Sequence, residues 1–159
     1  MSNWVLEDFE CGDISCQIIE FYIQGFVYVM LFNRVDAARS EEVISEKAEE
    51  LGIDYRENSY EVKFDTRANF DSSNFFSKPN ETLTSTQVRE LGFTIKELLD
   101  FHYRNSNAEA YVCVAESQGL KRFYDRLAKS YAEELNFSVR ANLGEEGLGY
   151  EITTPSYKS

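Results

Sequence analysis

Twenty residues near the N-terminus constrain the fold of this chain more than any other segment. Residues 14 to 33 are dense in β-branched and aromatic side chains and are interrupted only by Gln24-Gly25. Such residues favour strands, and a Gly-containing pair between two such runs is typical of a tight hairpin turn. The segment therefore predicts two antiparallel strands. The weak alternation of residues 4 to 9 predicts a third, shorter strand before them.

The length and composition indicate one folded domain over residues 1 to 159. Of the 159 residues, 43% are apolar and 14% are aromatic, which is enough to build a core and excludes a disordered chain. The longest apolar stretch, residues 26 to 32, is far shorter than the roughly 20 residues that cross a bilayer. Because the N-terminus also lacks the features of a signal peptide, we expect a cytoplasmic protein with no membrane partner.

The charge of the chain is strongly acidic and unevenly distributed. The formal net charge is −12, and residues 1 to 80 hold 7 basic and 16 acidic side chains. Such a surface repels nucleic-acid backbones and attracts basic proteins, so direct nucleic-acid binding is disfavoured. A charge that serves only solubility remains the alternative.

The spacing of apolar residues divides the rest of the chain into helices and strands. We expect helices that begin at Ser40 and at Thr84 and a third over residues 119 to 135, with strands over residues 60 to 64, 110 to 115, 137 to 141 and 148 to 153. Thr84 and Gln87 have the spacing of a capping box, and residues 65 to 83 look irregular. The fold class is therefore α+β, with a mixed, mostly antiparallel sheet flanked by about three helices.

From Tyr60 onward, the order strand, helix, strand, helix, two strands resembles the C-terminal part of the GCN5-related N-acetyltransferase family. The resemblance covers residues 60 to 153 and leaves an acidic N-terminal hairpin region over residues 1 to 64. The segment 89 to 94 (Arg-Glu-Leu-Gly-Phe-Thr) is similar to the family's acyl-CoA motif at Arg89 and Gly92. The resemblance implies a strand-to-helix turn that binds the pyrophosphate of acetyl-CoA, with Arg89, Gly92, Phe93 and Thr94 as cofactor-binding residues.

The segment 116 to 127 is similar to the family's helix that carries a catalytic Tyr. Tyr124 matches that Tyr, and Ser117 stands where the family commonly has Asn. The resemblance implies that Tyr124 is the general acid that protonates the departing thiolate and that Ser117 contacts the cofactor. Glu116, at the end of its strand, is a candidate base for an amine nucleophile.

For Gly92 and Tyr124 the sequence also allows a purely structural role. A continuous helix from Thr84 would place Gly92 inside the helix and abolish the phosphate-binding turn. Tyr124 lies on the inward stripe with Phe123 and Leu127, which is also typical of a packed core residue.

Two function classes follow. The first is an acyl-CoA-dependent N-acyltransferase, or a degenerate relative, with a small-molecule or protein amine as its substrate. The second is a non-catalytic acidic inhibitor of the immunity type, which blocks a basic partner such as a nuclease or a nucleic-acid-binding enzyme.

The remaining reactive side chains predict little chemistry. Cys11, Cys16 and Cys113 show no Cys-x-x-Cys spacing, and the chain holds a single His, so we expect no metal site. His102 lies on the apolar face of a predicted helix, where packing is the commoner role.

Overall fold

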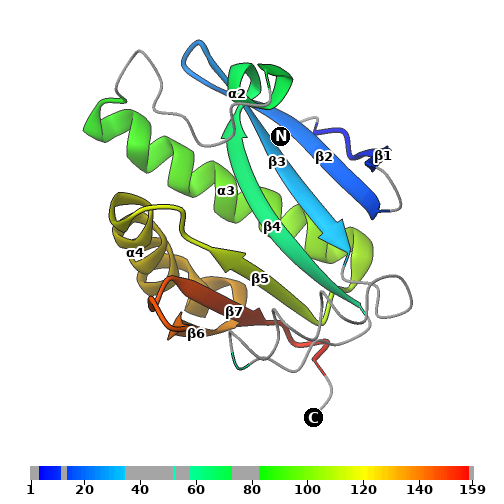
Figure 1. Ribbon diagram of the computed structural model, residues 1–159, viewed down its shortest axis with the longest axis vertical. Helices are drawn as coiled ribbons and strands as arrows, with labels where there is room; N and C mark the ends of the chain where they lie inside the picture. The colour runs from blue at the N-terminus through cyan, green and yellow to red at the C-terminus, as the bar shows by residue number, and fades with distance from the viewer. Residues whose placement is uncertain (1–3, 12–13, 35–51, 53–57, 73–82, 158–159) are drawn as a thin grey trace.

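The computed structural model describes residues 4–11, 14–34, 52, 58–72 and 83–157, and it has the α+β class that the sequence predicts. The described residues form one seven-stranded sheet and three helices (Figure 1). The strands are β1 (Glu7–Cys11), β2 (Ile14–Ile23), β3 (Phe26–Arg34), β4 (Ser59–Thr66), β5 (Ala110–Val114), β6 (Ser138–Leu143) and β7 (Gly149–Thr153). The helices are α2 (Arg67–Ser72), α3 (Ser85–Ser106) and α4 (Gln118–Leu135).

The strand order in the sheet is β1-β2-β3-β4-β5-β7-β6. Every neighbouring pair is antiparallel except β4 and β5, which are parallel. A parallel pair needs a long crossover, and α3 lies in the connection between β4 and β5. The parallel pair therefore divides the sheet into a meander of β1 to β4 and a smaller unit of β5, β7 and β6.

The predicted hairpin is confirmed as β2 and β3. Ile23 pairs with Phe26 across a two-residue turn, in which Gln24 has φ 44° and Gly25 has φ 94°. Two positive φ angles are the geometry of a type I′ turn, whose twist suits a hairpin. Alternate residues of both strands enter the core, among them Phe21 and Phe32.

The two long helices begin and end close to the residues that the sequence predicts. The Thr84 hydroxyl accepts a hydrogen bond from the Gln87 amide at 3.2 Å, and the Gln87 side chain accepts one from the Thr84 amide at 2.8 Å. This capping box satisfies two amides that the first turn of α3 would leave unpaired. The second long helix, α4, ends at Leu135, and the Asn136 that follows adopts the left-handed conformation that closes a helix.

The region predicted to be irregular contains a short helix, α2. The Thr66 hydroxyl accepts a hydrogen bond from the Asn69 amide at 3.2 Å, as an N-cap residue does, while the Asp65 carboxylate holds the Asn69 side chain at 2.8 Å. The irregular prediction was therefore wrong for residues 67 to 72, because local polar caps start a helix that shows no apolar periodicity. The helix predicted to begin at Ser40 lies outside the described residues.

His102 is a packed core residue, as its place on an apolar helical face predicts. Its imidazole is fully buried and stacks on the Phe32 ring, with 3.9 Å between ring centroids. One ring nitrogen lies 2.7 Å from the Tyr111 hydroxyl, and the other lies 2.7 Å from the Gln17 side-chain oxygen. The burial lowers the pKa of His102 from 6.5 to about 4, so the ring is neutral at physiological pH.

Candidate functional site

The parallel strands β4 and β5 separate after a short paired segment. Their register runs from Ser59 opposite Ala110 to Glu61 opposite Val112 and then ends. Strand β4 nevertheless continues to Thr66, still paired with β3 on its other side. Figure 1 shows the two strands side by side where both begin and diverging toward their C-terminal ends. A strand edge that loses its partner has backbone groups available for another chain or ligand.

A cavity of about 100 Å³ lies where the strands diverge, between the sheet and the helices α3 and α4. Its lining is apolar almost throughout. Both strands contribute, with Val62 and Phe64 from β4 and Cys113 from β5. Both helices contribute as well, with Ile95 from α3 and Leu127 from α4. Pockets with an apolar lining and few polar groups are the usual sites for small ligands.

Tyr124 is the sequence-predicted catalytic residue that the structure brings to this cavity. Its ring lies edge-on to Phe64 on one side and to Tyr150 on the other, with centroid distances of 6.0 and 5.6 Å. No hydrogen bond joins its hydroxyl to another of the described residues. Burial raises the pKa of Tyr124 well above its usual value of 10, so the phenol stays protonated and can donate a hydrogen bond into the cavity.

The other polar groups around the cavity are neutral or already engaged. Burial raises the pKa of the Cys113 thiol to about 12, so it does not ionise at neutral pH. The Tyr150 hydroxyl donates to the Asp125 carboxylate at 2.6 Å. Tyr124 and Tyr131 are the lining tyrosines whose hydroxyls form no hydrogen bond within the described part of the chain, and Tyr124 is the one that the sequence predicts to be catalytic.

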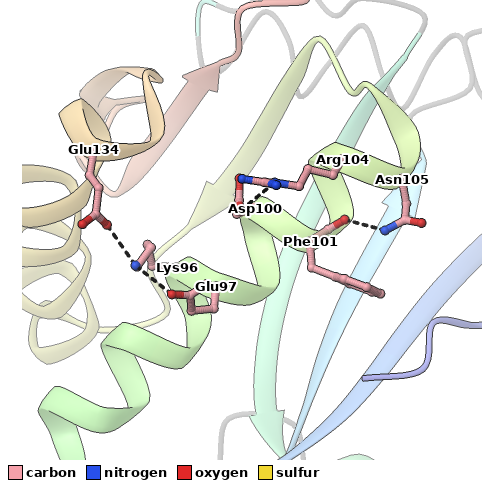
Figure 2. Close-up of polar contacts among 7 residues, drawn as sticks. All are labelled: Lys96, Glu97, Asp100, Phe101, Arg104, Asn105 and Glu134. Atoms are coloured by element: carbon pink, nitrogen blue, oxygen red, sulfur yellow. Dashed lines mark hydrogen bonds and ion pairs between the residues drawn. The ribbon is translucent and has the colours of Figure 1, made fainter. Parts of the chain in front are cut away.

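Lys96 closes one side of the cavity by joining α3 to α4. Lys96 is one of the lining residues, and its ammonium pairs with Glu97 at 3.0 Å and with Glu134 of α4 at 2.9 Å (Figure 2). The ammonium also lies 4.3 Å from the centre of the Phe93 ring. Burial lowers the pKa of Lys96, but the hydrogen bonds that it donates to Glu134 and Glu97, together with their negative charges, raise the pKa by more, so this lysine stays charged. The charge is thus neutralised by two carboxylates, and the cavity wall is almost wholly apolar.

The expected phosphate-binding turn at residues 89 to 94 does not exist. The capping box at Thr84 starts α3 before this segment, so Arg89, Gly92, Phe93 and Thr94 all lie inside the helix. Their amides belong to the helical ladder and cannot cradle a pyrophosphate. Arg89 and Phe93 instead point to solvent, and Phe93 is 48% exposed.

Gly92 has a packing role. A Cβ atom at this position would come within 2.6 Å of the Leu127 side chain on α4. The glycine therefore lets the two helices that cover the cavity approach each other closely, which accounts for a residue that costs about 1 kcal/mol in a helix interior.

Glu116 and Ser117 lie in the exposed turn between β5 and α4. The Ser117 hydroxyl accepts a hydrogen bond from the Leu120 amide at 3.1 Å and is the N-cap of α4. The Ser117 hydroxyl, which was predicted to contact a cofactor, is thus already engaged in capping α4. Glu116 is exposed and does not line the cavity, although it follows directly on β5.

The small residues that line the cavity were not predicted from the sequence. Ala128 and Ala132 lie one turn apart on α4 and both line the cavity. Two alanines four residues apart on the inward face of an amphipathic helix, among Leu and Tyr, were the available signal.

The described residues show neither a membrane-spanning helix nor a cluster of metal ligands. None of their helices combines the length and apolar content needed to cross a membrane, and no three of their His, Cys, Asp or Glu side chains are grouped to hold a metal ion. Comparisons with protein-family models, with curated proteins and with solved structures found no match to the chain. The chain is thus assigned to the α+β class and to no family.

Proposed function

We propose that this chain binds an acyl-CoA thioester at the divergence of β4 and β5, as an N-acyltransferase similar to the GCN5-related family or a degenerate relative of it. The single observation that carries the proposal is the Tyr124 hydroxyl. Tyr124 lines an apolar cavity beside the part of β4 that no longer pairs with β5, and its hydroxyl has no hydrogen-bond partner among the described residues. The succession β4, α3, β5, α4, β6 and β7 also supports the proposal, because the resemblance rests on this order.

The free edge of β4 suits the arm of the ligand. The pantetheine part of CoA is extended and carries amide groups, and extended amide chains bind strand edges through main-chain hydrogen bonds. Beyond Glu61, β4 offers such an edge on the side that faces β5. The thioester end of the arm would then lie in the cavity. Residues 89 to 94 are helical and offer no turn for the phosphates of the nucleotide end. The described residues therefore support binding of the pantetheine arm and the acyl group rather than of the phosphates.

A thioester supplies an acyl group with a good leaving thiol. The substrate amine would attack the carbonyl carbon, the C–S bond would break, and the amine proton would pass toward Glu116 at the exposed end of β5. Tyr124 would give its hydroxyl proton to the sulfur. Its raised pKa makes it a weaker acid than a free phenol, but the same apolar surroundings raise the basicity of a thiolate formed beside it.

Calorimetric titration with acetyl-CoA tests the binding, and an amine panel with detection of the released thiol tests the transfer. We expect micromolar binding to the wild type. Tyr124→Phe should bind within a few-fold of the wild type and transfer about 100-fold more slowly. Tyr22→Phe, at a residue that is 63% exposed on β2, is the matched control and should change neither. No heat at millimolar acetyl-CoA would overturn the proposal.

The acidic charge favours a second candidate, a non-catalytic inhibitor of a basic protein. Residues 1 to 80 carry a formal charge of −9, and Glu7 and Asp8 are exposed at the start of the edge strand β1. This function predicts inhibition of a basic nuclease that weakens as salt rises. A fluorogenic nuclease assay across a salt series, with Glu7→Lys/Asp8→Lys as the variant, would detect it.

A further inference from the structure

The cavity has a size that fits a short aliphatic chain better than an acetyl group. Its volume is about 100 Å³. A dry apolar cavity of roughly 150 Å³ accommodates the six carbons of benzene, so roughly four carbons fill the cavity of this chain. An acetyl group would place one methyl carbon there and leave most of the space empty.

The walls of the cavity fit a neutral chain and not a charged one. The Lys96 ammonium is paired with Glu97 and Glu134, as Figure 2 shows, and so does not offer an unpaired cation to a carboxylate in the cavity. The Cys113 thiol is neutral, because burial raises its pKa. A free fatty acid would therefore lose the hydration of its carboxylate without gaining a cation, and a sugar would bury more hydroxyls than the few polar groups of the lining can satisfy. An acyl group joined to a thioester carries its polar atoms at one end only.

Two alanines keep the cavity open. Ala128 and Ala132 line it from successive turns of α4, each directly after a larger lining residue, Leu127 or Tyr131. A leucine at either alanine would add three carbon atoms toward the same space. A larger side chain at either position would therefore reduce the space in the cavity.

From the volume, the apolar walls and the two alanines, we infer that this site selects acyl groups of about four to six carbons over acetyl. The inference rests on the proposed function, because it assigns the acyl class to the same thioester site. Burying one methylene contributes about 0.8 kcal/mol, which is about a fourfold gain in affinity. Butanoyl, with two more methylenes than acetyl, should therefore bind about 15-fold more tightly.

Titration with two series of thioesters tests the inference. S-Acyl-pantetheines and acyl-CoAs with two, four, six and ten carbons are titrated into the wild type. We expect affinity to rise about fourfold per methylene up to four to six carbons and to rise no further at ten. Ala128→Leu and Ala132→Leu should each abolish the gain from acetyl to butanoyl. Ser130→Leu, at an exposed position of the same helix, should retain it.

The two series separate the inference from the proposed function. Equal affinity for acetyl and butanoyl with clear binding of acetyl-CoA would overturn the chain-length inference and leave the proposed function standing. A chain-length preference among acyl-pantetheines without any binding of the acyl-CoAs would overturn the proposed function and leave the chain-length inference standing. The wild-type series decides the matter even if a leucine variant fails to fold, which circular dichroism would show.

Discussion

The burial of His102 makes a quantitative prediction about stability and pH. In the unfolded chain the imidazole takes up a proton near pH 6.5, whereas in the folded protein burial lowers its pKa to about 4. Between these values the unfolded state binds more protons, so protons favour unfolding. The contribution of the neutral ring is complete above pH 6.5 and is lost as the pH falls toward 4.

The size of the effect follows from the shift. A difference of one pKa unit corresponds to about 1.4 kcal/mol, so the free energy of unfolding should fall by about 2 kcal/mol between pH 7 and 5 and by about 3 kcal/mol by pH 4. The ring is fully buried against Phe32 and Tyr111, so solvent screening does not reduce this figure appreciably. His102→Gln keeps a polar, hydrogen-bonding side chain that does not titrate.

Urea denaturation of the wild type and of His102→Gln between pH 7.5 and 5 provides the assay. The single tryptophan, Trp4, packs edge-on against Phe101 at 6.0 Å between ring centroids, and its fluorescence reports unfolding. Subtracting one profile of the free energy of unfolding against pH from the other removes the contribution of the carboxylates, which both proteins share. We expect the wild type to lose about 2 kcal/mol more than the variant over this range. Parallel profiles would refute the assignment of a neutral buried imidazole.

Three further substitutions test the elements that shape the site. Thr84→Ala removes the capping box of α3 and should lower the free energy of unfolding by about 1 kcal/mol in urea denaturation; an unchanged midpoint would mean that the cap contributes nothing. Gly92→Leu forces a side chain against Leu127 and should cost about 1–3 kcal/mol in the same assay, whereas a stabilised protein would contradict the close helix contact. Arg140→Ala leaves the buried Glu151 carboxylate without the guanidinium that lies 2.7 Å away, and should cost about 2 kcal/mol. Adding Glu151→Gln to that variant should recover part of the loss, and no recovery would refute the pairing.

Local chemistry explains which parts of the fold could be predicted. The Gln24-Gly25 turn and the Thr84 capping box each depend on a few neighbouring residues, and both are confirmed. Helix α2 was missed because it begins from polar side chains, with Thr66 as its cap, and shows no apolar period.

The candidate site was only partly predictable, because it depends on where distant segments meet. Tyr124 could be singled out from its segment, but the cavity that it faces exists only because β4 and β5 separate beyond Glu61 and Val112. No residue pattern within either strand encodes that separation. The short motif at Arg89 and Gly92 was outweighed by the helical signal around it, and the role of Gly92 appears only when α4 is seen packed against α3.

The most direct test of the central claim is to map the binding of acetyl-CoA on the assigned amide spectrum of the protein. If the thioester binds in the cavity, the largest saturable shifts fall on β4 beyond Glu61, on Cys113 and on the turns of α4 from Tyr124 to Ala132. Shifts confined to the solvent face of α3, around Arg89 and Phe93, or no shifts at millimolar acetyl-CoA, would contradict it.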